Sequence, residues 1–343
     1  MNDIDRTNDL RAEASGALEE ALYEIKRVIV GQDAMLERLL VSLLAGGHVL
    51  LEGVPGLAKT LTVKTLAAVL GGSYNRIQFT PDLVPADLVG TRVYRPDTGG
   101  FDTELGPVHC NFLLADEINR APAKVQSALL EVMQEQQVTI GGTTYAVPLP
   151  FIVMATQNPI ESEGTYPLPE AQLDRFLMKI LVDYPSVGEE AAVVGRSLAE
   201  PPIVQERLSL DDLRRYATAA ATVLVDREAI GYAVALADAT RHPVNYGLEE
   251  IAPLIEFGAS PRGPIGLVQA ARVLALLRGR GHVLCDDIRD LSADVLRHRI
   301  VLSYDALSEG TTADELLERV LTAVPEPDAG RLLREAPTAV RAR

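Results

Sequence analysis

The sequence has little cysteine and no arrangement of histidines typical of a metal site. Cys110 and Cys285 are its two cysteines, far apart and without the C-x-x-C spacing of redox and zinc motifs. Such a pair is typical of buried thiols in a reducing compartment, and it argues against a disulfide scaffold. The five histidines show no H-E-x-x-H spacing, so we interpret each as a packing or surface residue.

Long hydrophobic runs are also missing. The longest apolar stretch, residues 39–51, is interrupted by a serine, two glycines and His48, and it is shorter than the roughly 20 residues that a membrane-spanning helix needs. Residues 1–6 lack the basic start and apolar core of a secretory signal. We therefore expect no membrane span and a cytoplasmic location.

Basic residues are in the minority. The chain has 32 lysines and arginines against 48 aspartates and glutamates, a formal net charge of −16. Such a chain repels a phosphate backbone, and no local basic stripe compensates, so we expect a protein partner and no nucleic acid. With 343 residues, 47% of them hydrophobic, the chain has room for two domains.

Apolar runs of strand length alternate with segments of helical spacing in the first half of the chain. This alternation predicts an α/β fold with a parallel sheet. After about Pro185 the pattern becomes helical, as in 210–225, 227–240 and 264–278, which predicts an all-helical second domain. We assign residues 1–185 to the first domain, 186–325 to the second and 326–343 to a mobile tail. The expected strands are 48–52, 76–80, 112–116, 151–156 and 177–182.

Residues 48–60 have the order strand, glycine turn and helix start, the layout of a nucleotide phosphate cradle. Gly53 and Gly56 allow a tight turn whose N–H groups can point at phosphate oxygens. Lys59 can then reach the β and γ phosphates, and Thr60 offers a hydroxyl to Mg²⁺. The residues expected to contact the nucleotide here are Gly53, Val54, Pro55, Gly56, Leu57, Ala58, Lys59, Thr60 and Leu61.

Ala58 departs from the usual spacing G-x-x-x-x-G-K-[ST], in which glycine precedes the lysine. If this position needs a left-handed backbone, alanine costs roughly 1–2 kcal/mol there. The alternative is an ordinary glycine-rich turn between a buried strand and a helix. The complete order of strand, turn, lysine, hydroxyl and helix favours the phosphate cradle.

Asp116 and Glu117 end the apolar strand 112–116, where the carboxyl end of a buried parallel strand would meet the phosphates. We expect Asp116 to hold Mg²⁺ through water and Glu117 to polarise the attacking water. The alternative is a strand that ends in a solvated acidic turn. A helix predicted over 11–30, with Gln32 just after it, is expected to lie beside the nucleotide base.

Another acidic pair, Asp286-Asp287, is most simply solvated and suits a helix N-cap before Ile288.

The chain resembles the MoxR branch of the AAA+ ATPases. The matching blocks are residues 53–60, 116–122, 155–159 and 166–176, and Ala58 is itself common in that family. The resemblance implies a P-loop αβα sandwich with a five-stranded parallel sheet and a helical lid. It also implies ATP and Mg²⁺ as nucleotide and metal, and a ring-shaped homo-oligomer, expected to be a hexamer.

Further roles follow from the resemblance alone. Asn158 corresponds to the sensor that orients water and the γ-phosphate, although Asn-Pro is otherwise a routine turn signal. Arg175 corresponds to the arginine finger that reaches the neighbouring subunit's nucleotide; the alternative is a surface ion pair. Arg262 corresponds to the second sensor, which links γ-phosphate to lid position; the alternative is a plain helix start. Arg120 is a further candidate for the subunit interface.

Two segments resemble the moving parts of the family. Residues 81–105 correspond to its helix-2 insert, and 138–147 to the hairpin before the first sensor. The pair Gly141-Gly142 between β-rich runs is also a two-residue hairpin signal in its own right. A plain surface hairpin is the alternative.

The resemblance implies chaperone-like remodelling, maturation or activation of protein clients, together with a partner that carries a von Willebrand factor A domain. Two other functions stay open: a nucleic-acid motor, which the charge opposes, and a nucleotide-gated scaffold without turnover, which Glu117 opposes. A GTPase is disfavoured because the chain has no Asn-Lys-x-Asp segment.

Overall fold

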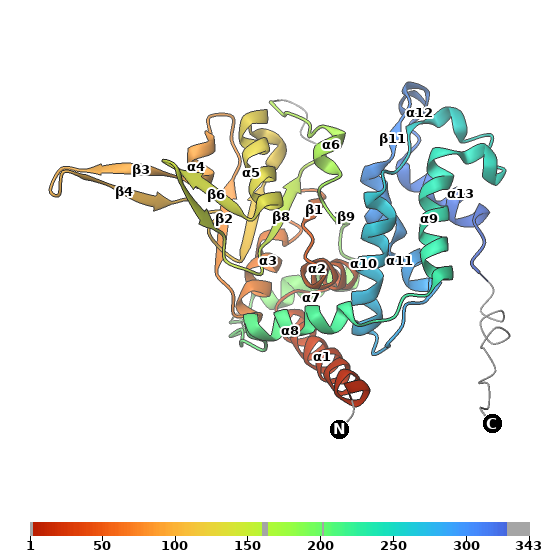
Figure 1. The fold of residues 1–343 in the computed structure, drawn as a ribbon, viewed down its shortest axis with the longest axis horizontal. Helices are drawn as coiled ribbons and strands as arrows, with labels where there is room; N and C mark the ends of the chain where they lie inside the picture. Colours follow the sequence, from red (N-terminus) through yellow and green to blue (C-terminus); the bar gives the residue numbers. More distant parts are fainter. Residues whose placement is uncertain (1–2, 160–163, 201, 328–343) are drawn as a thin grey trace, which may run out of the picture.

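The computed structural model describes residues 3–159, 164–200 and 202–327. Within them, a five-stranded parallel sheet has the strand order β2-β5-β8-β1-β9 (Figure 1). The five predicted strands are confirmed, each end within two residues of its predicted place. They are β1 (Val49–Glu52), β2 (Tyr74–Gln78), β5 (Phe112–Asp116), β8 (Ile152–Gln157) and β9 (Met178–Leu181).

Helices cover the sheet on both faces. Alternate residues of a strand point to opposite faces, so Val49 and Leu51 of β1 belong to one hydrophobic cluster and Leu50 to another. The first cluster includes apolar residues of α3 (Lys59–Val69), and the second includes those of α5 (Ala123–Glu135). This double cover is what nearly continuous apolar strands require, and the αβα sandwich is confirmed.

The first helix differs from its predicted range. α1 spans Asp3–Lys26, so it begins and ends earlier than the predicted 11–30. Gly31 and Gln32 then take left-handed conformations, with φ of 64° and 58°, and lead into α2 (Asp33–Leu44). The left-handed pair separates α1 from α2, and the predicted helix end at residue 30 was wrong by four residues.

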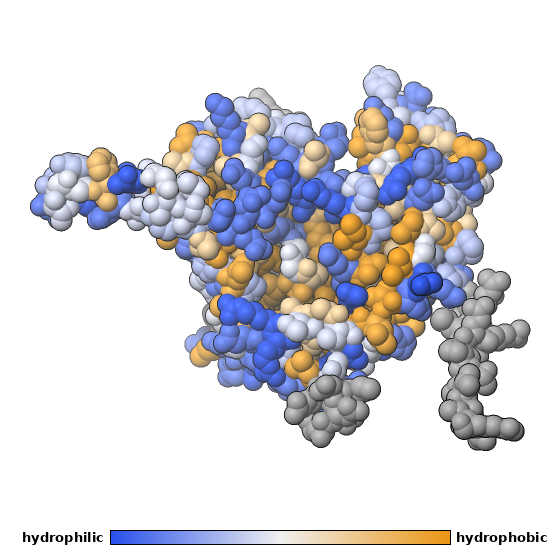
Figure 2. Space-filling view, viewed as in Figure 1, coloured by the Kyte–Doolittle hydropathy of each residue, from blue (hydrophilic) through white to orange (hydrophobic). Residues whose placement is uncertain are grey.

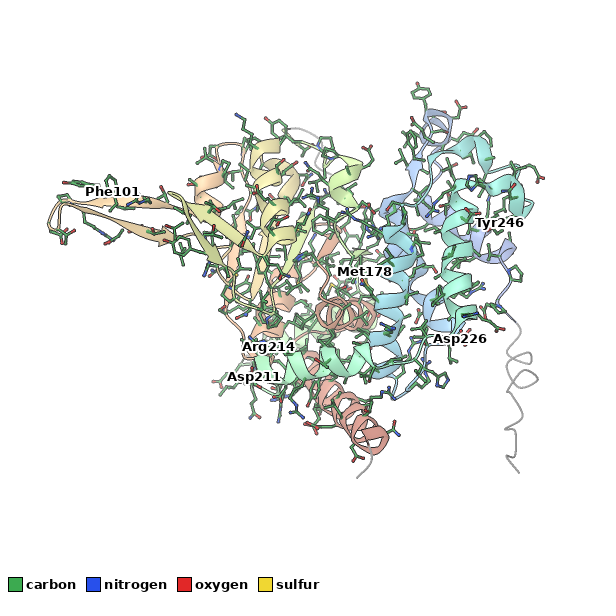
Figure 3. The ribbon with its side chains drawn as sticks, in the orientation of Figure 1. Phe101, Met178, Asp211, Arg214, Asp226 and Tyr246 are labelled. Atoms are coloured by element: carbon green, nitrogen blue, oxygen red, sulfur yellow. The ribbon has the colours of Figure 1, made fainter. Side chains whose placement is uncertain are left out.

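Two hairpins extend from the sheet part. β6 (Gln137–Ile140) and β7 (Thr143–Ala146) are joined by Gly141-Gly142, both at positive φ, so the hairpin signal is confirmed. The segment 81–105 holds α4 (Pro85–Val89) and a second hairpin of β3 (Gly90–Arg95) and β4 (Gly100–Leu105), which was not predicted. It projects far from the sheet, and Phe101 lies near its end (Figure 3).

Helices dominate the second part of the chain, as predicted, and on the face in Figure 2 hydrophobic residues gather around α10. One correction concerns β10 (Ile255–Phe257) and β11 (Val301–Leu302), which form a short antiparallel pair that interrupts the all-helical pattern. Strands of two and three residues are too short to show a period in the sequence. The remaining helices are α6 (Glu170–Leu173), α7 (Val187–Ser197), α8 (Leu210–Ala221), α9 (Arg227–Arg241), α10 (Arg262–Leu277), α11 (Cys285–Leu296), α12 (Tyr304–Glu309) and α13 (Ala313–Ala323).

No helix among the described residues is long and apolar enough to cross a bilayer. Of the predicted tail, residues 328–343 lie outside the described part of the chain.

The acidic pair at 286 and 287 also needs correction. α11 begins at Cys285, so both aspartates lie in its first turn and neither is the N-cap. Asp287 is fully buried, and its carboxylate accepts hydrogen bonds from Arg278 Nη1 at 3.1 Å and Arg280 Nη1 at 2.7 Å. The two guanidinium groups compensate the loss of water around the carboxylate, which is why an acidic residue is stable inside the second part.

We expect Asp287→Ala to lower the free energy of unfolding by about 2–4 kcal/mol, because it leaves two partly buried arginines without their carboxylate. Asp286→Ala is the matched control, since Asp286 is exposed in the same helical turn and contributes less than about 1 kcal/mol through the helix dipole. Urea unfolding of both variants measures the difference; equal losses would contradict the structural role of Asp287.

Candidate functional site

The loop between β1 and α3 has the backbone that a phosphate cradle needs. Gly56 has a φ of 89°, and Ala58 has φ 55° and ψ 15°, so both are left-handed. The strain expected at Ala58 therefore applies. Gly53 is needed for another reason: a Cβ there would lie 2.5 Å from the carbonyl oxygen of Val182, which follows β9. Close approach of two backbones thus excludes any side chain at position 53.

A cavity of about 350 Å³ lies where this loop meets the ends of β5 and β8. Gly53 and Val54 directly follow β1 and do not line the cavity, whereas residues 55–61 of the predicted loop do. The structure thus brings together three segments that lie apart in the sequence: the loop after β1, the end of β5 and the end of β8. The lining residues are Pro55, Gly56, Leu57, Ala58, Lys59, Thr60, Leu61, Asp116, Glu117, Thr156, Gln157 and Asn158.

Lys59 begins α3, and its side chain folds back over the loop. Its Nζ donates a 2.5 Å hydrogen bond to the carbonyl oxygen of Gly53. Partial burial lowers the pKa of Lys59, while the nearby carboxylates of Asp116, Glu117 and Glu52 act in the opposite direction. An ammonium group that has lost water and holds one neutral acceptor is suited to bind an anion.

Asp116 and Glu117 are held by one hydroxyl from the neighbouring strand. Thr156 Oγ1 donates to Asp116 Oδ1 at 2.6 Å and accepts from the backbone N–H of Glu117 at 2.8 Å. Arg76 on β2 donates to the other oxygen of Asp116, from Nη2 at 2.7 Å and from Nε at 3.1 Å. The first carboxylate is therefore fixed on both of its oxygens.

Glu117 lies in a left-handed conformation with a φ of 55°. Its Oε2 accepts a 2.7 Å hydrogen bond from Gln78 Nε2 and lies 3.0 Å from Arg120 Nε. Arg120, the candidate interface residue, is thus paired with Glu117 in the same chain. Both contacts hold the Glu117 carboxylate in place within its own chain.

Asn158 lines the cavity, whereas Gln32 does not. Asn158 follows β8, is 7% exposed and lines the cavity beside Thr156. Gln32 is not among the lining residues; its Nε2 donates a 2.9 Å hydrogen bond to the carbonyl of Asp183. Asp183 is the residue after Val182, which packs on Gly53, so Gln32 contacts the segment that supports the base of the loop.

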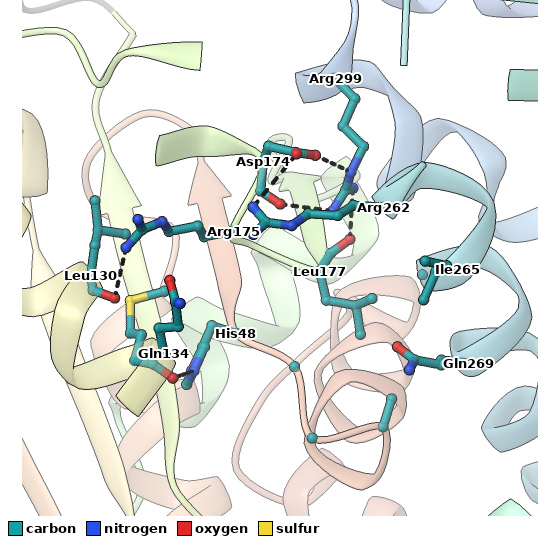
Figure 4. A pocket seen from close by; sticks show the side chains of 15 residues that line it. His48, Leu130, Gln134, Asp174, Arg175, Leu177, Arg262, Ile265, Gln269 and Arg299 are labelled. Atoms are coloured by element: carbon teal, nitrogen blue, oxygen red, sulfur yellow. Dashed lines mark hydrogen bonds and ion pairs between the residues drawn. The ribbon is translucent and has the colours of Figure 1, made fainter. Parts of the chain in front are cut away.

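Arg175 and Arg262 do not line the cavity around Lys59. Both face a second cavity of about 250 Å³ between the sheet part and α10, with Asp174 beside them (Figure 4). Arg175 Nη1 donates to the carbonyl of Leu130 at 3.2 Å, and Arg262 Nη1 lies 3.6 Å from Asp174 Oδ2. The structure groups the two predicted arginines with each other and separates both from the predicted phosphate site.

Sequence reasoning missed the partners of the carboxylates. Arg76 and Gln78 alternate with buried Ile77 on the edge strand β2, and Gln78 is in register with Asp116. Polar residues at alternate positions near the end of a strand were the available signal. Thr156 carried no signal of its own, because its role depends on which strand lies beside β5.

The chain is similar to known proteins over most of its length. A model of the ATPase family associated with various cellular activities (AAA) matches residues 48–178, and an AAA lid domain model matches 249–320. The chain is 57% identical over 310 residues to Chaperone MoxR1 of Mycobacterium tuberculosis, covering 90% of this chain and 82% of that protein. It is 35% identical to Protein MoxR of Paracoccus denitrificans, covering 90% and 96%. A solved structure from Cytophaga hutchinsonii is 46% identical, with a TM-score of 0.90 and coverage of 94% and 99%.

Ala58→Gly should retain nucleotide binding and change the free energy of unfolding by less than about 1 kcal/mol, because relief of left-handed strain is offset by the greater freedom of glycine in the unfolded chain. Ala58→Val should cost more than about 1 kcal/mol and weaken binding, since a β-branched residue resists positive φ. Denaturant unfolding and titration with a fluorescent ATP analogue measure both effects. Equal behaviour of the two variants would argue against a left-handed residue at this position.

Proposed function

Because the chain belongs to the MoxR family of AAA+ ATPases, we propose that it hydrolyses ATP with Mg²⁺ in a ring of identical subunits, expected to be a hexamer. The energy drives chaperone-like remodelling or activation of a protein client, with a von Willebrand factor A domain protein as partner. The observation that carries the proposal is the single cavity lined by Lys59, Asp116, Glu117 and Asn158.

The residues around this cavity suit a triphosphate with its metal. The first turn of α3 lines it through Lys59, Thr60 and Leu61, and the N-terminus of a helix favours an anion. The hydroxyl of Thr60 and the carboxylate of Asp116 are the hard oxygen donors that Mg²⁺ prefers. When bound, Mg²⁺ neutralises charge on the phosphate oxygens. Lys59 would exchange the Gly53 carbonyl for a phosphate oxygen.

Glu117 supplies the base in this proposal. To accept a proton from water, its carboxylate has to be released from Gln78 and Arg120, which now hold it at 2.7 and 3.0 Å. Asn158 can donate its amide N–H to phosphate while its carbonyl accepts from the attacking water. The proposed hydrolysis therefore requires the release of Glu117 as well as the binding of ATP.

Arg175 and Arg262 act on the nucleotide of the neighbouring subunit. Both arginines line the second cavity and neither lines the cavity around Lys59 in their own chain, which supports a role at the neighbouring nucleotide for both. Arg262 would then act together with Arg175. A permanently charged planar guanidinium stabilises charge on the transferred phosphoryl group. A surface that carries the arginines of one subunit to the cavity of the next is heterologous, and such contacts form a ring when the rotation between neighbouring subunits closes.

A protein client fits the chain better than nucleic acid does. The net charge of −16 disfavours a phosphate backbone. The β3–β4 hairpin presents Tyr94 and Phe101, 52% and 58% exposed, in edge-to-face contact at 5.3 Å, with Arg92 over the Phe101 ring at 5.0 Å. Exposed aromatic residues on a projecting hairpin suit contact with a polypeptide, and we assign this hairpin to the client.

Lys59→Ala should abolish ATP binding, because it removes the cation from the cavity. Glu117→Gln should bind ATP normally and lower kcat by about 100-fold or more, because it removes the base and leaves the cradle intact. Isothermal titration and a phosphate-release assay separate the two effects. If both variants lost binding equally, or if Glu117→Gln kept the wild-type rate, the assigned roles would be wrong.

Arg175→Ala and Arg262→Ala should each be inactive alone, with kcat reduced by about 100-fold or more, yet each should regain activity when mixed with Lys59→Ala subunits. The Lys59 variant supplies intact arginines, and the arginine variant supplies an intact cavity. ATPase rates across a series of mixing ratios measure the recovery. Rescue of Arg175→Ala but not of Arg262→Ala would return Arg262 to its own subunit, and rescue of neither would contradict action between subunits.

A further inference from the structure

Arg299 belongs to the second part of the chain but contacts the segment that carries Arg175. It ends the short turn Arg297–Arg299 after α11, and its side chain is 3% exposed. Its Nε donates to Asp174 Oδ1 at 2.9 Å, and its Nη2 donates to the carbonyl oxygens of Phe176 at 2.7 Å and Asp174 at 3.3 Å. Its Nη1 donates to the carbonyl oxygen of Leu177 at 3.1 Å (Figure 4).

These acceptors lie on both sides of Arg175 in the chain. One guanidinium group therefore holds the backbone of residues 174, 176 and 177, from which the Arg175 side chain projects. The rigid fork of five N–H donors allows arginine to satisfy several acceptors at once, which an ammonium group on a flexible stem cannot do in the same geometry.

Asp174 joins this contact to the rest of the second part. Its Oδ2 accepts a 2.9 Å hydrogen bond from Ser260 Oγ and lies 3.6 Å from Arg262 Nη1. Burial lowers the pKa of Arg299 to about 10, against the attraction of Asp174, so Arg299 keeps its charge at neutral pH. The segment around Arg175 is thus attached to the lid by a charged and largely buried pair.

We propose that Arg299 is a positioning residue for Arg175: it fixes the backbone from which the finger reaches the neighbouring nucleotide, so that the placement of the lid decides whether that nucleotide is hydrolysed. This inference rests on the proposed function of Arg175. A positioning role can be told apart from a general stabilising role. An Arg299 substitution should impair hydrolysis in the cavity of the neighbouring subunit and leave the cavity of its own subunit competent.

The test compares Arg299→Gln and Arg299→Lys with Arg297→Gln as matched control. Arg297 lies in the same turn, is 11% exposed, and also reaches the sheet part, where it donates to the carbonyl of Lys179 at 2.5 Å, but it does not contact residues 174–177. Each variant is assayed alone and in mixtures with Lys59→Ala subunits, and its ATP affinity is measured in the Glu117→Gln background.

We expect both Arg299 variants to lose about tenfold or more in kcat while ATP Kd stays within about twofold, because only the finger is displaced. Lys59→Ala subunits should restore the activity of both. Arg297→Gln should keep kcat within about threefold, since it leaves the finger segment attached.

Three results would overturn the inference. The Arg299 variants could lose activity that Lys59→Ala subunits do not restore, they could bind ATP more weakly in their own cavity, or Arg297→Gln could show an equal loss of kcat. If neither Arg299 variant folds, Ser260→Ala is used instead. It removes the hydrogen bond from Ser260 Oγ to Asp174 and the 3.1 Å bond that this hydroxyl accepts from the backbone N–H of Arg262, without removing a charge. A loss of activity that is rescued supports the inference, and an unchanged or unrescued rate overturns it. If Arg175→Ala is itself not rescued, the proposed function fails and this inference fails with it. If Arg175→Ala is rescued and the Arg299 variants are not, only the inference is wrong.

Discussion

The parallel register between β5 and β8 is the constraint on which the site depends. It places Ala115 opposite Ala155, so that Thr156 is level with the end of β5 and its hydroxyl contacts both the Asp116 carboxylate and the Glu117 backbone. Because β1 pairs with the other edge of β8, the phosphate loop starts from the same end of the sheet. A slip of one residue would turn Thr156 to the opposite face and separate the loop, the carboxylates and Asn158.

The candidate functional residues fall into two groups at separate cavities. Lys59, Asp116 and Glu117 converge on one cavity, whereas Arg175 and Arg262 meet around Asp174 at another. In the proposed function, each chain holds an incomplete site and completes that of its neighbour. Within one subunit, Gln78 and Arg120 hold Glu117, and the Gly53 carbonyl holds Lys59, so the proposed hydrolysis requires both side chains to be released.

The sequence was informative where the signal is local. Periodicity and spacing predicted the five strands, the phosphate loop and the carboxylates at the end of β5. The β3–β4 hairpin was missed because residues on both of its faces are largely exposed and show no apolar alternation. Arg299 and Asp174 are 125 residues apart in the chain, so the sequence does not predict their contact. The burial of Asp287 is not predicted either, because its two arginine partners become its neighbours only in the fold.

A cryo-electron microscopy structure of Glu117→Gln assembled with ATP and Mg²⁺ tests most directly whether one subunit completes the site of the next. We expect a closed ring in which Lys59 has left the Gly53 carbonyl for a phosphate oxygen and the neighbour's Arg175 and Arg262 reach the γ-phosphate. An ATP-loaded assembly in which Arg175 still contacts Leu130 of its own chain, with no arginine from another subunit near the phosphate, would contradict it.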